Sequence, residues 1–200
     1  MLGIFALDPV NFTLSQLLYS FDDLPYGKSW SEWTISWWKW RLPLSSSNDL
    51  QYHRFDHNVI FLPYSFVEHK ETDLIMPAGK DLFFPTITAI NSDREDKRMK
   101  TDQDLIRWSK EDVGKVAERE VTLNSQRFEP VPVCSEPFYA EYPPCNRWNV
   151  TPGSSRAICS GYWTFIRGLS AGKYEIHTRG LCLAGKIKRE SYYSLTLTAD

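Results

Sequence analysis

His177 and Arg179 are the residues of this chain whose types and spacing are best suited to chemistry. They stand two apart in residues 173–183, where alternating apolar and polar positions predict a β-strand. Because alternate residues of a strand share a face, both side chains are expected to point the same way. With a carboxylate from a distant strand they could form an acid–base site, since histidine changes charge near neutral pH. The simpler interpretation is a strand histidine bonded to a neighbour, and we assign no catalytic residue.

The sequence has none of the short signatures that identify common catalytic or cofactor sites. It contains no Gly-x-Ser-x-Gly elbow, phosphate-binding glycine loop, dinucleotide fingerprint, His-Glu-x-x-His pair or His-x-His pair. His53 and His57, with Asp56 between them, could share a metal ion. Exposed polar residues of a loop are the simpler interpretation of this segment. We therefore expect neither a metal nor a cofactor.

Composition limits the partners of the protein. A formal net charge of −2 argues against binding to a nucleic-acid backbone. No apolar run reaches the length of about 18 residues that predicts a transmembrane segment. Residues 1–9 lack the basic start and long apolar core of a secretory signal.

The four cysteines lie in the last third of the chain and include no Cys-x-x-Cys pair, which argues against a zinc or redox site. They are Cys134, Cys145, Cys159 and Cys182. A disulfide between Cys134 and Cys145 is the easiest pairing, across a short loop, and free thiols are equally compatible with the sequence.

The most clearly specified element is a helix over about residues 29–41. Ser29 and Glu32 have the spacing of a capping box, in which each side chain bonds the free backbone N–H of the other residue. Pro43 cannot continue the helical hydrogen bonds and disfavours helical angles at Leu42. The helix should therefore end near Arg41 or Leu42.

Five of the eight tryptophans fall in this helix. At about 100° per residue, four of them share an arc of roughly 80°: Trp30, Trp33, Trp37 and Trp40. This stripe is most simply a core anchor that docks on a sheet. Trp38 lies about 80° beyond the edge of the stripe, and we expect it to be partly exposed. An exposed indole could stack on a sugar ring, so Trp38 is a candidate ligand-binding residue.

The sequence predicts β-strands over most of the remaining chain. Short runs of β-branched and aromatic residues predict strands at 59–62, 64–67, 82–84 and 87–90. Pro63 and Pro85 require edge positions or bulges.

Residues 158–168 and 173–183 are expected to pair as a hairpin around the loop at 170–172, with Phe165 facing His177 and Trp163 facing Arg179. In that register Cys159 and Cys182 point to opposite faces.

A second helix is expected over about 102–118, with Thr101 and Asp104 as its capping box. Near the end of the chain, the apolar residues at 193, 195 and 197 alternate with polar ones, which predicts a strand with one buried face. Together these elements predict a mainly β protein: a single antiparallel β-sandwich domain over residues 1–200, jelly-roll-like, with an irregular lead at 1–25 and two covering helices.

Three segments resemble motifs of a known family of uncharacterised bacterial and archaeal proteins. They are Tyr-Gly-Lys-Ser-Trp-Ser-Glu-Trp-Thr-Ile-Ser-Trp-Trp-Lys-Trp at 26–40, Met-Pro-Ala-Gly-Lys-Asp-Leu-Phe-Phe-Pro at 76–85, and the segment 161–180, which begins Gly-Tyr-Trp and contains Leu-Ser-Ala-Gly and Ile-His. The resemblance covers about 25–198. Members of the family usually carry a signal peptide, so the resemblance implies a mostly β, extracytoplasmic protein of unknown function. It supplies no catalytic or binding residues.

The function expected from the sequence is a non-enzymatic binding or structural module of the cell envelope or exterior, with a carbohydrate or a protein as its partner. The alternative is an enzyme whose site contains His177, Arg179 and a distant carboxylate. Side chains that converge in a deep pocket favour the enzyme. An exposed aromatic patch or a shallow groove favours the binding module.

Overall fold

The computed structural model describes residues 14–44, 52–55, 58–64, 66–95, 98–183 and 186–199. Its helical elements are α1 (Leu14–Leu17), η1 (Pro25–Gly27), α2 (Trp30–Arg41), η2 (Leu42–Leu44) and α3 (Asp102–Gly114). One sheet has six strands, in the order β1-β2-β4-β9-β7 with β8 also paired to β9: β1 (His53–Arg54), β2 (Val59–Phe61), β4 (Asp81–Ser92), β7 (Val131–Cys134), β8 (Phe138–Tyr142) and β9 (Gly153–Ile166). The other has five, in the order β3-β11-β10-β5-β6: β3 (His69–Pro77), β5 (Val116–Leu123), β6 (Gln126–Phe128), β10 (Gly172–Cys182) and β11 (Ile187–Thr198). Among these helices, none has the length and apolar character needed to cross a membrane.

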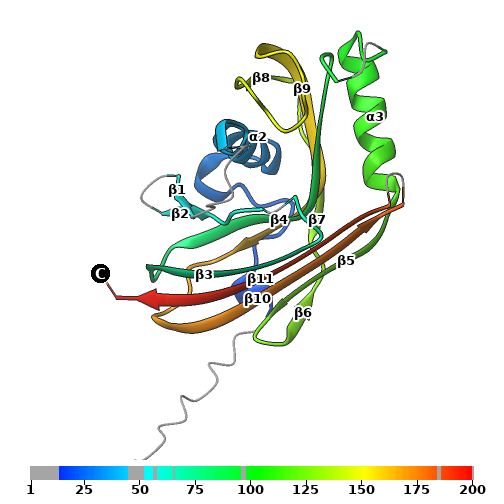
Figure 1. Cartoon of the computed structure of the whole chain (residues 1–200). Helices are drawn as coiled ribbons and strands as arrows, with labels where there is room; N and C mark the ends of the chain where they lie inside the picture. Colours follow the sequence, from blue (N-terminus) through cyan, green and yellow to red (C-terminus); the bar gives the residue numbers. More distant parts are fainter. Residues whose placement is uncertain are drawn as a thin grey trace, which may run out of the picture.

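The two sheets pack face to face through one shared core. The two principal helices both pack on the six-stranded sheet. Figure 1 shows α2 on one side of the six-stranded sheet, the five-stranded sheet on the other, and α3 beside the far ends of β4 and β9. Side chains of both sheets, such as Phe84 of β4 and Ile176 of β10, share the core between them. Leu105 of α3 packs on Ile158 of β9 in a smaller cluster. The chain is thus mainly β with two principal helices, as the sequence predicts.

Most neighbouring strands are antiparallel, but β2 runs parallel to β4 and β3 runs parallel to β11. The expectation of purely antiparallel pairing is therefore too narrow, because both sheets are mixed. The cause is the path of the chain. After β2 it enters the five-stranded sheet as β3 and then returns to the six-stranded sheet as β4, beside β2.

Both ends of α2 lie where the local sequence predicts them. The Ser29 hydroxyl accepts a hydrogen bond from the Glu32 amide at 3.3 Å, and the Glu32 carboxylate accepts one from the Ser29 amide at 2.8 Å. This is a complete capping box. Leu42 caps the other end, directly before Pro43. The expected docking of the tryptophans on a sheet is also confirmed, since they form one core with aromatic residues of the six-stranded sheet.

The buried side of α2 is rotated from the one expected. Trp38 is fully buried, at 0% exposure, whereas Trp40 is only partly buried. The expectation that Trp38 is the partly exposed ring is therefore wrong. Its indole ring lies 6.0 Å from that of Trp148, which follows β8. The segment around Trp148 covers the helix on a second side, in addition to the sheet. A wider arc of the helix surface is therefore buried than packing on the sheet alone would bury.

Strands β9 and β10 do not form the expected hairpin. β9 pairs with β4, β7 and β8, whereas β10 pairs with β5 and β11, so the two strands belong to different sheets. Leu18 occupies the position beside Ile166, and the Arg167 amide donates to the Leu17 carbonyl at 2.7 Å. The prediction that Phe165 pairs with His177 across a hairpin is therefore wrong, and so is the predicted pairing of Trp163 with Arg179. A short glycine-containing loop is compatible with both a hairpin and a crossover between sheets.

One helix boundary and one expected strand also differ from the prediction made from the sequence. The second helix ends at Gly114 rather than near 118, because residues from Val116 onward pair with β10 as β5. No strand forms at Tyr64, Phe66 or Val67, which link the two sheets after β2. The expected bulge at Pro85 is confirmed by a shift in the pairing of β4 with β9.

The three sequence motifs meet around α2 and the six-stranded sheet. The Tyr26 hydroxyl donates to the Asp81 carboxylate at 2.9 Å, which joins the first motif to the second. The Gly79 amide donates to the Leu169 carbonyl at 2.7 Å, which joins the second to the third. A cluster of indole and phenyl rings joins the first to the third. These motif residues therefore hold the layers together.

Candidate functional site

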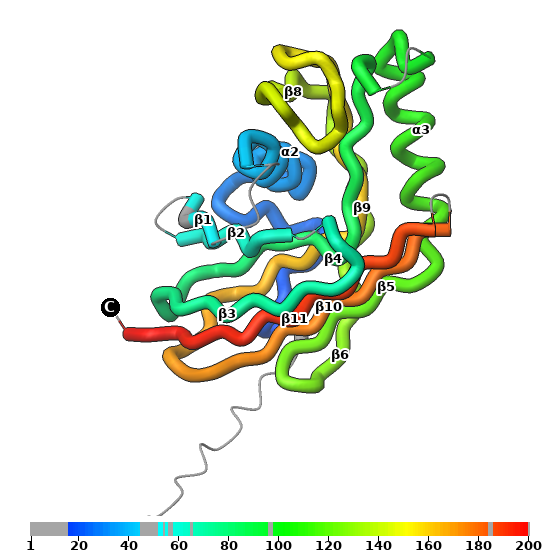
Figure 2. Tube along the Cα trace, in the orientation of Figure 1, coloured from blue at the N-terminus to red at the C-terminus, as the bar shows by residue number. Residues whose placement is uncertain are grey.

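The outer face of the five-stranded sheet carries both strand residues singled out by the sequence. In β10, Ile176 and Thr178 are each 1% exposed and point into the protein. The alternating residues His177 and Arg179 therefore point outward. Strands β3, β11, β10 and β5 lie side by side and support this face (Figure 2).

His177 is held by two residues of β11. Its Nε2 lies 3.0 Å from Glu190 Oε1, and its ring stacks on that of Tyr192, with centroids 4.2 Å apart and planes 9° apart. The Tyr192 hydroxyl donates to the same Glu190 oxygen at 3.2 Å. The structure thus fixes the histidine by a carboxylate and an aromatic ring.

His69 of β3 extends this group on the other side of β11. Its Nδ1 lies 3.9 Å from Glu190 Oε2, and its ring centroid lies 5.3 Å from that of Tyr192. Desolvation alone raises the pKa of Glu190, but the hydrogen bonds from His177 and Tyr192 outweigh it and the pKa is lowered. Glu190 is therefore an ionised acceptor at neutral pH. We call His69, His177, Glu190 and Tyr192 the histidine group.

Arg179 has a different partner. Its Nη2 lies 2.9 Å from Glu118 Oε2 on β5, and both side chains are 44% exposed. The distant carboxylate that reaches His177 is therefore that of Glu190 on β11. Arg179 instead pairs with a carboxylate on β5, the strand on the other side of β10. An exposed ion pair of this kind contributes little to stability.

A hollow that opens to solvent is lined in part by the histidine group. It is lined by carboxylates, hydroxyls and the rings of His177 and Tyr192, and crosses four strands; its polar members include Glu71, Asp73, Thr122, Glu175 and Ser194. Tyr192 is 38% exposed. Carboxylates accept hydrogen bonds and an aromatic face packs on apolar C–H groups. The surface can therefore bind a ligand that presents both hydroxyls and C–H faces.

Trp38, the third predicted ligand-binding residue, is not on this surface or on any other. Its indole N–H donates to the Thr88 hydroxyl at 3.3 Å inside the protein. The partly exposed indole of α2 is Trp40, whose ring stacks on His53 at 5.4 Å with planes 12° apart. Burial lowers the pKa of His53. The other members of the predicted metal pair, His57 and Asp56, lie outside the described residues.

The described part of the chain contains neither a grouped set of metal ligands nor a disulfide. Among the residues that the structure describes, no three His, Cys, Asp or Glu side chains are grouped so as to hold a metal ion. All four cysteines are free thiols. Cys159 is fully buried, and desolvation raises the pKa of its thiol to about 12. Such a thiol is a poor nucleophile.

A second polar group was not anticipated from the sequence. Arg41, Arg147 and Arg189 meet around Tyr64 and Phe66, near the end of α2. These residues are far apart in the chain and form no motif. One signal could have indicated part of the group: at about 100° per residue, Arg41 falls close to Trp30 and Trp37 on the helix, so the docking of the stripe predicts a buried arginine.

No protein-family model matches the sequence, and no curated protein matches it significantly. Among solved structures, the chain aligns with one chain of "Structure of PbICP-C in complex with falcipain-2", over 70% of this chain and 99% of that chain. The two are 11% identical and superpose with a TM-score of 0.28. A similarity this low carries no argument about fold or function.

Proposed function

We propose that this protein is a non-enzymatic binding module and that its ligand lies on the outer face of the five-stranded sheet, over His177 and Tyr192. The observation that carries the proposal is the histidine group, in which an aromatic pair and an ionised carboxylate are held together on two neighbouring strands. Sites on strands keep their geometry better than sites on loops. This arrangement is therefore preorganised for a ligand.

The chemistry of the surrounding side chains favours a carbohydrate. Carboxylates of Glu71, Asp73 and Glu175 line the hollow and can accept hydrogen bonds from hydroxyl groups. Tyr192 offers a partly exposed ring for an apolar sugar face. A basic protein segment is the second ligand class that this acidic hollow could accept. The location outside the cytoplasm that the family resemblance implies is consistent with either ligand.

The alternative is an enzyme built on His177, Arg179 and a distant carboxylate. The hydrogen bond between His177 and Glu190 gives this alternative an acid–base pair. The group lies on an open sheet face, however, and catalysis by such a pair gains most in a site that excludes water. Arg179 is paired with Glu118 and does not complete the pair with His177. The binding module is therefore the better supported function.

A glycan array and a library of basic peptides, followed by calorimetric titration, test the proposal. For a ligand found in this way, His177→Ala and Tyr192→Ala should each weaken binding about tenfold or more, equivalent to about 1.4 kcal/mol. Thr196→Ala is the matched control, since Thr196 lies on the same face of β11 and outside the hollow. Its affinity should stay within about twofold of the wild type.

Two results contradict the proposal. One is a complete panel without any ligand. The other is a ligand whose affinity is the same in the His177→Ala, Tyr192→Ala and Thr196→Ala variants. Because Tyr192 and His177 are partly exposed, their replacement should change the free energy of unfolding by no more than about 0.5 kcal/mol. A loss of binding can then be separated from a loss of fold.

A further inference from the structure

Arg41 is a buried cation at the C-terminal end of α2, on the packed face of the helix. It is 1% exposed. Its Nη1 donates to the Leu44 carbonyl at 2.8 Å, and its Nε and Nη2 lie 3.4 and 3.5 Å from the Tyr64 carbonyl. Both acceptors are uncharged backbone carbonyls, so these bonds orient the guanidinium without neutralising it.

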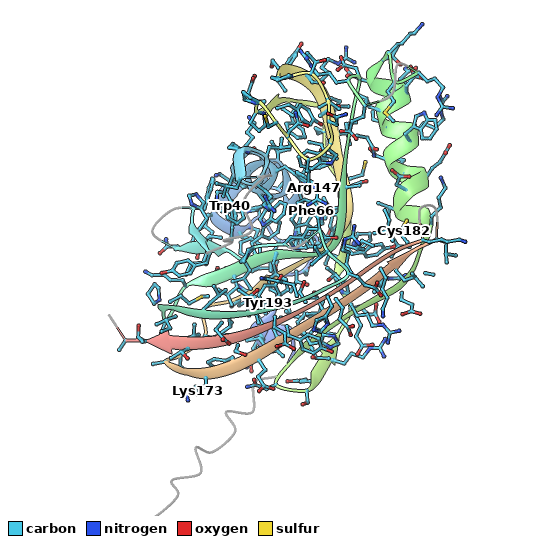
Figure 3. The ribbon with its side chains drawn as sticks, in the orientation of Figure 1. Trp40, Phe66, Arg147, Lys173, Cys182 and Tyr193 are labelled. Atoms are coloured by element: carbon cyan, nitrogen blue, oxygen red, sulfur yellow. The ribbon has the colours of Figure 1, made fainter. Side chains whose placement is uncertain are left out.

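Arg147 adds a second guanidinium at the same place. The ring of Phe66 lies 4.9 Å from the Arg41 Cζ and 4.1 Å from the Arg147 Cζ, so one phenyl ring contacts both cations. Figure 3 shows Phe66 and Arg147 next to each other, between α2 and the long strands of the six-stranded sheet. Arg147 is exposed, whereas Arg41 is buried. The pair therefore leads from the surface into the protein.

Arg189 supplies a third guanidinium from β11. Its Nε is buried and has no hydrogen-bond partner among the described residues. Burial raises the pKa of Tyr64 and outweighs the opposing effect of the neighbouring Arg189 and Arg147, so that the pKa is about 12. The three arginines, which we call the arginine cluster, thus meet around Tyr64 and Phe66.

The positive charge of the cluster is not balanced by nearby acids. Within the described ranges, no carboxylate forms an ion pair with Arg41, Arg147 or Arg189; the nearby Glu68 pairs with Lys188 at 3.4 Å. Burial and, to a smaller extent, the charge of Arg147 lower the pKa of Arg41 to about 10, so Arg41 still carries its charge at neutral pH. Burial and the charge of Arg189 also lower the pKa of Arg147. The cations thus repel one another.

A structural role explains only part of this arrangement. A cation at the C-terminal end of a helix is stabilised by the helix dipole and by free carbonyl groups, which accounts for Arg41. It does not account for Arg147, an exposed side chain placed against two other cations, or for the unsatisfied Nε of Arg189. An anion between the three guanidiniums would remove the repulsion and satisfy the free donor.

We propose that the arginine cluster binds a tetrahedral oxyanion, a phosphate or sulfate group, either as the free ion or as an ester on a larger ligand. Guanidinium groups match the oxygens of such anions through paired N–H donors. Three of them supply more donors than one carboxylate can accept, which favours an anion with three or four oxygens. The exposed side chain of Arg147 gives the anion a route from solvent.

This site is separate from the proposed ligand surface. Arg189 and Glu190 are consecutive residues of β11, and their side chains point to opposite faces because strand residues alternate. Glu190 belongs to the histidine group on the outer face, and Arg189 faces Tyr64 inside. Either proposal can therefore fail without the other.

Thermal unfolding at constant ionic strength tests this proposal. Chloride is exchanged for inorganic phosphate, sulfate or acetate, and a hexose 6-phosphate provides the ester. Phosphate or sulfate at about 100 times its Kd should raise the Tm by roughly 5–10 °C, and acetate should have little effect. If the ester alone raises the Tm, the anion belongs to a larger ligand; if inorganic phosphate is sufficient, the free ion is bound.

Arg147→Gln and Arg189→Gln are the informative variants, because Arg41→Gln removes a fully buried side chain and could prevent folding. Each should reduce the affinity for phosphate, measured by calorimetric titration, about tenfold or more. Arg119→Gln is the matched control, since Arg119 also lies over an aromatic ring, at 4.9 Å from Tyr162, but outside the cluster. No stabilisation of the wild type by any of these phosphate or sulfate compounds overturns the proposal. So does equal stabilisation by acetate, or stabilisation that persists in Arg147→Gln and Arg189→Gln.

Discussion

The interface between α2 and the six-stranded sheet is filled with aromatic rings, whereas the outer face of the five-stranded sheet carries polar side chains paired with one another. Trp33 and Trp37 are both 0% exposed, and each ring contacts several others. On the outer face, His177, Glu190 and Tyr192 bond side by side at the surface. The tryptophans, which stand out most in the sequence, thus serve the fold, whereas the proposed ligand surface combines His177 with residues of a neighbouring strand.

The buried indole rings of α2 should contribute most to the stability of this interface. Trp33→Ala removes a ring that packs on Phe61, Phe83 and Phe165. Urea unfolding should show a loss of about 3–5 kcal/mol in the free energy of unfolding, as for other buried aromatic residues. The partly exposed Trp40 is the control, and Trp40→Ala should lose about 1–2 kcal/mol. An equal loss in both variants would place the buried side of α2 elsewhere.

A smaller effect tests the backbone of the same layer. A Cβ atom at Gly161 of β9 would lie 2.3 Å from the Ile87 carbonyl oxygen and 2.8 Å from the Thr88 Cα. Because strand backbone cannot move aside easily, Gly161→Ala should lower the free energy of unfolding by about 1–3 kcal/mol. At Gly114, where α3 ends, a Cβ would meet nothing within 4 Å. Gly114→Ala should be neutral or stabilising by up to about 1 kcal/mol; the reverse order of the two variants would contradict the packing of β9 on β4.

The smallest effect concerns the start of α2. Ser29→Ala removes both hydrogen bonds of its hydroxyl to Glu32 and should lower the free energy of unfolding by about 1 kcal/mol. The other half of the capping box predicts a pH dependence, because the hydrogen bonds from Ser29 lower the pKa of Glu32 in the folded protein. The contribution of this carboxylate is therefore complete above its unfolded pKa of about 4.3 and is lost as the pH falls through the lowered folded value. Wild type and Glu32→Gln should differ in Tm at pH 7 and converge at low pH; a difference that grows on acidification is incompatible with the capping box.

Features encoded by neighbouring residues could be predicted from the sequence. The capping boxes of both helices, the end of α2 before Pro43 and the bulge at Pro85 depend on local chemistry, and all are present. Pairing between distant segments could not be predicted. The loop after β9 permits a hairpin, but Leu18 pairs with Ile166 instead and β10 joins the other sheet.

The candidate sites divide in the same way. Strand alternation correctly placed His177 and Arg179 on one face of the strand, because side-chain direction in a strand is a local property. That this face is the outer one followed only from the structure. The partner of His177 is on β11 and that of Arg179 is on β5, and nothing in the spacing of the sequence specifies either. Trp38 was misplaced because the exposure of a helical residue depends on every segment that covers the helix, here including Trp148.

The indoles of α2 form a dry layer against the six-stranded sheet. Hydrogen exchange of the indole N–H groups, followed by NMR on the folded protein, tests it directly. The Trp33 indole donates to the Pro25 carbonyl at 3.1 Å and the Trp37 indole to the Leu62 carbonyl at 3.2 Å, both inside the protein. Their exchange should be slower than that of a free indole by about a thousandfold or more, while the Trp40 indole exchanges much faster. Exchange of the Trp33 and Trp37 indole N–H groups at the rate of Trp40 would show that this layer is open to water.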